Sequence, residues 1–274
     1  MDITFDNIYQ EYANIFSKHA IDISSLGWCD PWVMGLVCLK AIEYKNEPDK
    51  GFILTKDKKI LSYLKRMHLE VFLEELTYGK FLDIFKKLEI KEKENLNVQE
   101  ILHCEFRDNF DARLSSGIKN MFTKIGMNEK DGSMATALVG ELGNNVFDHN
   151  EGLWPTNVRG AIILAQNNPM QNKIEVVVAD PGVGFKSSLR LARPSPDNDI
   201  NAIKLGLSGV TGRIGEIRGN GLRVIQKWTI GKFDGIVKIH SGNGLVIVDK
   251  NGLTEKIVFP ILGSLTSFVV KYNL

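Results

Sequence analysis

The sequence predicts an α/β protein. A C-terminal α/β sandwich, with a mixed and mostly antiparallel sheet and helices on one face, is expected to follow a small α/β domain. Two features predict the sandwich: a long amphipathic helix at residues 130–150, and a strand rich in β-branched residues at 173–179 that precedes a series of strand-like runs. Short strands and helices alternate in the first hundred residues. We therefore assign residues 1–95 to the small domain and 96–274 to the sandwich.

The helix at 130–150 is expected to bury one face and to present polar groups on the next. Its apolar positions share one stripe at about 100° per residue: Ala135, Leu138, Leu142 and Val146. Polar positions follow on the adjacent stripe: Glu141, Asn145, Asp148 and His149. Glu141 and Asn145 stand one turn apart, so a carboxylate that polarises a water lies near an amide oxygen that can bind Mg²⁺.

Two glycine-containing motifs follow this helix. Asp180 ends the predicted strand and precedes Gly182 and Gly184. A carboxylate held there can accept a hydrogen bond from an exocyclic amine, and the glycines let the backbone approach a flat base. Gly219 and Gly221 then open a helix that is expected to reach about residue 228. Helix starts present unpaired N–H groups that bind phosphate, so the motifs together indicate a nucleotide site.

The three motifs resemble the N-box, G1 box and G2 box of the GHKL superfamily of gyrase, heat-shock chaperone, histidine kinase and MutL ATPases. The resemblance covers residues 120–274 and implies the Bergerat ATP-binding fold, with ATP and Mg²⁺ as cofactors. It implies a role for each motif residue: Glu141 as general base or water-orienting group, Asn145 as magnesium ligand, Asp180 as acceptor for the adenine amino group, Gly182 and Gly184 around adenine, and Gly219, Gly221 and Leu222 around the phosphates.

His149 matches a position that is often polar or histidine in the kinase branch, and a buried structural histidine is the alternative. Residues 186–218 match the ATP lid and are expected to form the most mobile loop. Arg213 and Arg218 either reach the phosphates or face solvent. The last family motif, usually a glycine and a threonine before the final strand, is altered in this chain at residues 263–268. The resemblance still implies that Thr266 lies on the adenine side, with a contact through water.

The remaining strands are expected at 158–165, 174–180, 235–240, 245–249, 255–259 and 267–272. Residues 241–244 have the composition of a hairpin turn. Residues 86–97 alternate in charge and are interpreted as a solvated linker. Residues 99–124 are expected to be helical, and His103 within them is either an ordinary helix residue or a phospho-acceptor.

The first domain weakly resembles STAS modules, which partner anti-sigma kinases. The resemblance lies in the expected order of elements, which is a strand, a turn, a helix from Pro31, a strand at 51–55 and an amphipathic helix. STAS modules carry a phosphorylatable serine at the helix start, where this chain has Asp30, Pro31 and Trp32. Ser24 and Ser25 are expected to lie in the strand as structural residues, so the resemblance does not imply a phospho-acceptor here.

Composition narrows the class of protein. A net charge of +1 gives no drive toward nucleic acid or anionic membranes. The 3 cysteines have neither metal-ligand spacing nor an even disulfide set, which favours a reducing cytoplasm. No signal peptide or long apolar window occurs, so no membrane span is expected. The lack of sequence after Leu274 argues against the long clamp machines of the superfamily.

The expected function is Mg-dependent ATP binding with slow hydrolysis, in which an ATP-ordered lid switches an interaction with a protein partner. The N-terminal domain is the expected partner-binding part, and a homodimer is compatible with the sequence. Two alternatives stay open: a protein kinase of the histidine-kinase or anti-sigma type that acts in trans, and a non-catalytic nucleotide-sensing module. Glu141 argues against the last, because a sensor needs no general base.

Overall fold

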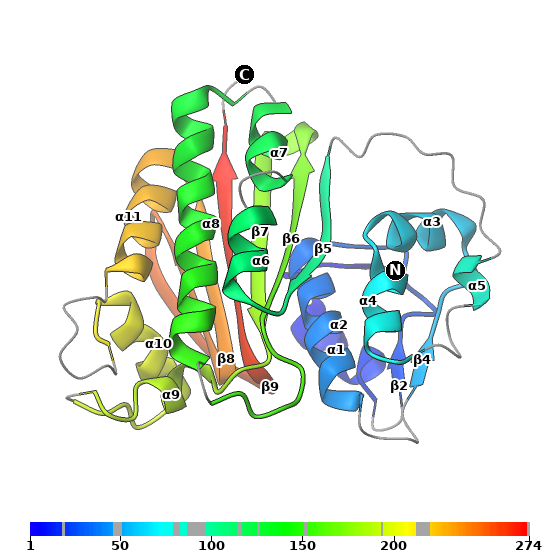
Figure 1. Cartoon of the computed structure of the whole chain (residues 1–274), viewed down its shortest axis with the longest axis horizontal. Helices are drawn as coiled ribbons and strands as arrows, with labels where there is room; N and C mark the ends of the chain where they lie inside the picture. The colour runs from blue at the N-terminus through cyan, green and yellow to red at the C-terminus, as the bar shows by residue number, and fades with distance from the viewer. Residues whose placement is uncertain are drawn as a thin grey trace.

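The computed structural model describes residues 1–17, 20–45, 51–78, 83–86, 97–113, 117–124, 127–150, 153–192, 194–211 and 220–272. In this part of the chain a five-stranded antiparallel sheet, in the order β5-β6-β7-β9-β8, forms the centre of the molecule (Figure 1). Its strands are β5 (Val98–Cys104), β6 (Ala161–Asn168), β7 (Lys173–Asp180), β8 (Ile236–Asp249) and β9 (Gly252–Lys271). A 3₁₀ turn at Pro169–Gln171 joins β6 to β7. The predicted α/β class is confirmed.

Both faces of the sheet are buried at its central strand, β7. On β7, Ile174, Val176 and Val178 point into one hydrophobic cluster, whereas Val177 and Ala179 point into another. Successive strand side chains face opposite sides, so a strand covered on both faces is apolar without interruption. This explains the β-branched run that marks β7 in the sequence.

Five helices in the described chain pack on the first face of the sheet: α6 (Arg107–Arg113), α7 (Lys119–Lys124), α8 (Glu129–Asn150), α10 (Asp199–Leu207) and α11 (Gly221–Phe233). The short α9 (Gly184–Ser188) follows β7. The apolar stripe predicted for α8 is buried. Phe110 of α6 packs on α8 at Gly143, where an added Cβ would lie 2.0 Å from the ring. This glycine therefore fixes how closely α6 approaches α8.

The N-terminal region covers the second face. α2 (Pro31–Tyr44) is buried at every position except Glu43. It begins where Asp30 accepts a hydrogen bond from the Val33 backbone N–H at 2.9 Å. At Gly35 an added Cβ would lie 2.7 Å from Leu265 of β9, so the missing side chain lets the helix approach the sheet closely. The N-terminal region and the sheet thus share one hydrophobic cluster.

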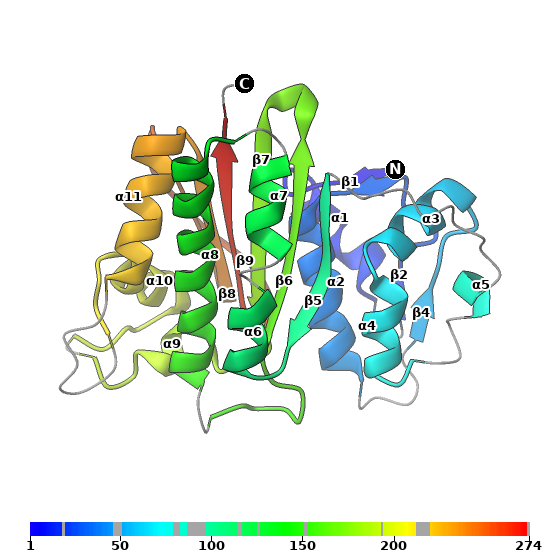
Figure 2. The same ribbon diagram turned by 45° about the horizontal axis from the view of Figure 1, so that its top comes forward.

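The other N-terminal elements surround α2, on the side of the sheet away from α11 (Figure 2). Two parallel strand pairs occur there, β1 (Asp2–Ile3) with β3 (Trp28–Cys29) and β2 (Ala20–Asp22) with β4 (Gly51–Ile53). The helices are α1 (Ile8–Ile15), α3 (Lys58–Arg66), α4 (Leu69–Glu75) and α5 (Asp83–Lys86). The proposed domain boundary near residue 95 stays a prediction, because residues 87–96 of the expected linker lie outside the described ranges.

Several local predictions are wrong. Residues 98–104 form strand β5, paired with β6, rather than the start of a helix. His103 lies on this strand with Nδ1 3.1 Å from Glu75 Oε2 and Nε2 2.8 Å from the Arg159 carbonyl oxygen. Both ring nitrogens are therefore engaged, which does not favour a phospho-acceptor. Ser24 and Ser25 lie in an exposed turn after β2 rather than in the strand.

The hairpin turn is also displaced. β8 continues through residues 241–244 with an irregular register at Gly242, and the turn lies between Asp249 and Gly252. The two runs expected at 255–259 and 267–272 belong to the single strand β9. The segment 186–218, expected as one long lid loop, contains the end of α9 and all of α10, and α10 buries Ala202, Ile203, Gly206 and Leu207. Residues 193 and 212–218 of the expected lid lie outside the described residues. None of the described helices combines the length and apolar content needed to cross a membrane.

A buried ion pair lies between the N-terminal region and the sheet. Lys238 Nζ lies 2.6 Å from Glu175 Oε1, and the two side chains are 7% and 9% exposed. The same ammonium group lies 4.2 Å from the centre of the Phe5 ring. Burial raises the pKa of nearby Asp30 to about 6; Glu175 adds to this increase and Lys238 opposes it. Lys238 therefore compensates buried negative charge.

Replacing Lys238 with Met should lower the free energy of unfolding by about 3 kcal/mol or more, because Glu175 would remain buried without its partner. Replacing both Lys238 and Glu175 with Met should cost much less. Equilibrium denaturation in urea measures both. Lys271→Met, which removes an exposed pair with Asp234, is the control and should change stability little. If the single and the double variant lost the same free energy of unfolding, Lys238 would not compensate the buried charge of Glu175.

Candidate functional site

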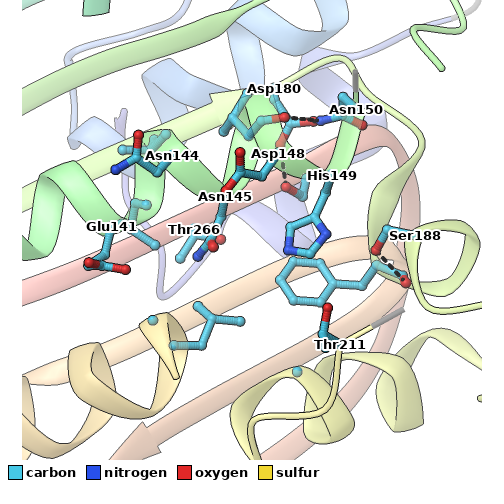
Figure 3. A pocket seen from close by; sticks show the side chains of 18 of the residues that line it. Glu141, Asn144, Asn145, Asp148, His149, Asn150, Asp180, Ser188, Thr211 and Thr266 are labelled. Carbon is cyan, nitrogen blue, oxygen red and sulfur yellow. Dashed lines mark hydrogen bonds between the residues drawn. The ribbon is translucent and has the colours of Figure 1, made fainter. Parts of the chain in front are cut away.

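A cavity of about 410 Å³ lies between α8, the end of β7, the interior of β9, and described residues in and near α9, α10 and α11. It brings together most of the residues that the sequence singled out: Glu141, Asn145, Asp180, Gly184, Gly221, Leu222 and Thr266. Figure 3 shows the polar side chains of α8 pointing into it. Gly219, Arg213 and Arg218 lie outside the described residues. Segments more than one hundred residues apart therefore meet at one site.

Asp180 forms the buried polar end of the cavity. The pairing of β7 with β9 places it directly opposite Ser264. Its Oδ1 accepts hydrogen bonds from Asn150 Nδ2 at 3.0 Å and from the Gly182 backbone N–H at 2.9 Å. The Ser264 hydroxyl donates to Oδ2. Three donors thus hold the carboxylate in one orientation.

Burial raises the pKa of Asp180 to about 6, and the hydrogen bonds from Ser264, Gly182 and Asn150 limit the increase. The Asp180 carboxylate is therefore ionised near pH 7, but burying its charge lowers the stability of the folded protein. An ionised carboxylate is only an acceptor, so a ligand that reaches it must supply an N–H or O–H donor.

Asn150, which the sequence did not single out, connects α8 to the loop after β7. Its Nδ2 donates to the Val146 carbonyl oxygen as well as to Asp180, and its Oδ1 accepts from the Val183 backbone N–H at 2.9 Å. An added Cβ at Gly182 would lie 2.0 Å from the Asn150 amide oxygen. A glycine is therefore needed at position 182 to make room for the Asn150 side chain. Gly182 lies behind the cavity and does not line it, in contrast to its predicted place around adenine.

The opposite end of the cavity joins α8 to the start of α11. An added Cβ at Gly221 would lie 2.8 Å from Glu141 Oε2 and 3.5 Å from Asn145 Nδ2. Glu141 is exposed at the rim, and Asn145 is half-buried. Asn220 makes no side-chain cap for α11, and backbone N–H groups at a helix start favour anions. This end can bind a phosphate chain.

The described residues contain no cluster of three or more His, Cys, Asp or Glu side chains suited to a metal ion. A magnesium ion at Asn145 would therefore need most of its oxygen ligands from a phosphate group and water, which is a usual arrangement for Mg²⁺. The amide oxygen beside the α11 start fits such a role.

Apolar side chains form the walls between the two ends. Val178, Phe185, Leu189 and Val210 line the cavity. Gly206 of α10 lies against this wall, where an added Cβ would be 3.0 Å from the Phe185 ring. Gly184 has φ +73°, which favours glycine, and an added Cβ there would lie 2.7 Å from Ser241 Oγ. Thr266 lines the cavity on β9, but the hydroxyl bonded to Asp180 is that of Ser264.

Two further residues face the cavity. Arg107, at the start of α6, donates from Nη1 to Asn144 Oδ1 at 3.1 Å and pairs through Nη2 with Asp148. His149 is half-buried in the lining, so it is not an enclosed structural histidine. Arg107 was not identified from the sequence, because nothing in its local pattern connects it to a helix forty residues later.

Comparison with known proteins gives no family assignment. The chain matches no protein-family model, and a search of curated proteins finds no match.

The Asp180→Asn variant should be more stable than the parent at pH 7.5, by up to roughly 3 kcal/mol, because the variant buries no charge. A carboxyl with a raised pKa binds its proton more tightly in the folded state, so the parent gains stability as pH falls. The difference should therefore shrink below pH 6 and disappear below about pH 4. Urea denaturation across this range measures it, with Asp6→Asn as the surface control. A less stable variant at pH 7.5 would contradict the assignment.

Proposed function

We propose that this protein binds ATP with Mg²⁺ at the cavity and hydrolyses it slowly, as a GHKL-type ATPase. The observation that carries the proposal is the Asp180 carboxylate, buried at one end of the cavity and fixed by Asn150, Gly182 and Ser264. The GHKL assignment itself rests on the resemblance of the three motifs.

The Asp180 end suits adenine. The exocyclic amine of adenine can donate to the carboxylate, while Val178, Phe185 and Leu189 offer apolar contact to the ring. Guanine and hypoxanthine present a carbonyl oxygen at the same position, and two acceptors facing each other repel. The fixed, ionised acceptor therefore favours adenine over these bases.

The Asn145 end suits a magnesium-bound phosphate chain. The described lining includes the carboxylates of Glu141, Asp148 and Asp180, which would repel a free triphosphate. A magnesium ion reduces this repulsion and gives Asn145 a ligand role. Glu141 at the rim can orient a water against the terminal phosphate, which is sufficient for slow hydrolysis because phosphoryl transfer depends mainly on positioning and charge.

The proposal includes a protein partner and a cytoplasmic location. Cys29, Cys38 and Cys104 are buried and form no disulfide, which is compatible with a reducing compartment. α2 is covered by the sheet, so a partner of the N-terminal region would bind through its other elements. As the sequence predicts, ATP would order the lid and thereby change the surface that the partner contacts. Residues 212–218 of the expected lid lie outside the described residues.

Asp180→Asn should weaken Mg-ATP binding roughly tenfold or more, because the charge-assisted acceptor for the adenine amine is lost. Calorimetric titration of Mg-ATP and Mg-ITP into the parent and the variant measures this. The parent should prefer ATP, and the variant should lose that preference. No binding of either nucleotide by the folded parent would rule out the nucleotide site.

Glu141→Ala should retain Mg-ATP affinity within about twofold but lower phosphate release by at least roughly a hundredfold, because the group that orients water is removed. Glu129→Ala, at an exposed position in the first turn of α8, is the matched control. Release is followed with purified protein, and labelled ATP shows whether phosphate moves to protein instead. Unchanged release by Glu141→Ala would exclude it as the base, and labelled protein would favour the kinase alternative.

A further inference from the structure

We propose that Arg107 binds the phosphate chain of the nucleotide and that Asp148 holds its guanidinium in place until the nucleotide arrives. This inference rests on the proposed ATP site and names a described residue that adds positive charge to it. Neither the three motifs nor the sequence around Arg107 assigned it such a role.

The position of Arg107 supports this role. Its guanidinium reaches the cavity from α6 and contacts Asn144 and Asp148, which stand one turn apart on α8. Asn144 is the immediate neighbour of Asn145, the proposed magnesium ligand. Among the described residues that line the cavity, Arg107 is the single lysine or arginine. Arg107 thus brings a positive charge to the cavity beside the part of α8 that carries Asn145.

The negative charge of the cavity lining favours a cationic side chain at the phosphate site. Glu141, Asp148 and Asp180 bring negative charge to a site whose proposed ligand is itself an anion. Magnesium offsets part of this repulsion, and a second cation beside the phosphates would offset more of it. Guanidinium groups bind phosphate through paired N–H donors, a geometry that a lysine does not match.

The Arg107–Asp148 pair can be exchanged at low cost. The two side chains are 40% and 29% exposed, and ion pairs in contact with water contribute little to stability. A phosphate group offers more charge and more acceptor oxygens than one carboxylate. Arg107 can therefore rotate from Asp148 to the nucleotide while the backbone of α6 stays in place.

The packing of α6 keeps Arg107 within reach. Phe110, one turn further along α6, is fully buried against Gly143 of α8. The guanidinium carbon also lies 5.8 Å from the centre of the Phe147 ring. α6 is thus anchored to the nucleotide-binding helix independently of the Asp148 pair, which separates the binding role of Arg107 from a structural one.

Calorimetric titration of ATP, ADP and adenosine with Mg²⁺ tests the inference in the parent, Arg107→Gln and Asp148→Asn. Arg107→Gln should weaken ATP binding roughly tenfold and leave adenosine binding within about twofold. Asp148→Asn should tighten ATP binding severalfold, because it removes a competing carboxylate. Arg159→Gln is the matched control, since it removes an exposed positive charge that pairs with Glu105 away from the cavity lining.

Equal weakening of ATP and adenosine in Arg107→Gln would overturn the inference and leave Arg107 a structural role. Unchanged or weaker ATP binding by Asp148→Asn would overturn it too, and this variant decides the matter if Arg107→Gln does not fold. Failure of the parent to bind any of the three ligands would instead refute the ATP site itself, so the two failures are distinguishable.

Discussion

The pairing of β7 with β9 is the constraint on which the rest of the structure depends. It sets Asp180 opposite Ser264 and Val178 opposite Thr266. A slip of one residue would turn every side chain of β7 to the other face. That slip is prevented because Val177 and Ala179 fill one hydrophobic cluster while Val176 and Val178 fill the other. The hydrophobic packing on both faces of β7 therefore fixes the position of the Asp180 carboxylate, although this polar group is not part of either hydrophobic cluster.

The site joins a rigid end to a less enclosed one. At the Asp180 end, Asn150 ties the last turn of α8 to the loop after β7, and burial of the carboxylate works against stability. At the Glu141 end, side chains are exposed or half-buried. Proteins commonly retain such destabilising groups where a ligand requires them. A preorganised acceptor beside a looser polar rim suits recognition of a base at one end and chemistry at the other.

Regular periodicity made α8 and β7 predictable. Glu141 and Asn145 lie on the polar stripe of α8, Asp180 ends β7 and Gly221 begins α11, and the cavity brings these residues together. β5 was missed because an edge strand of mixed pattern resembles an amphipathic helix in a short window. Asn150, Ser264 and Arg107 were missed because their roles arise from tertiary contacts. The packing of α2 against the sheet could not be predicted from the sequence either, because a helix that is apolar on all sides does not indicate which surface covers it. ATP binding and hydrolysis stay predictions.

The docking of α2 has a consequence for synthesis of the chain. Ribosomes make proteins from the N-terminus, so α2 emerges long before β9, whose Leu265 packs against Gly35. Until more than two hundred further residues have followed, an almost wholly apolar helix lacks the sheet that covers it in the finished fold. A partly synthesised chain therefore cannot yet bury the face of α2 that carries Gly35, and this face is covered only after β9 has been made.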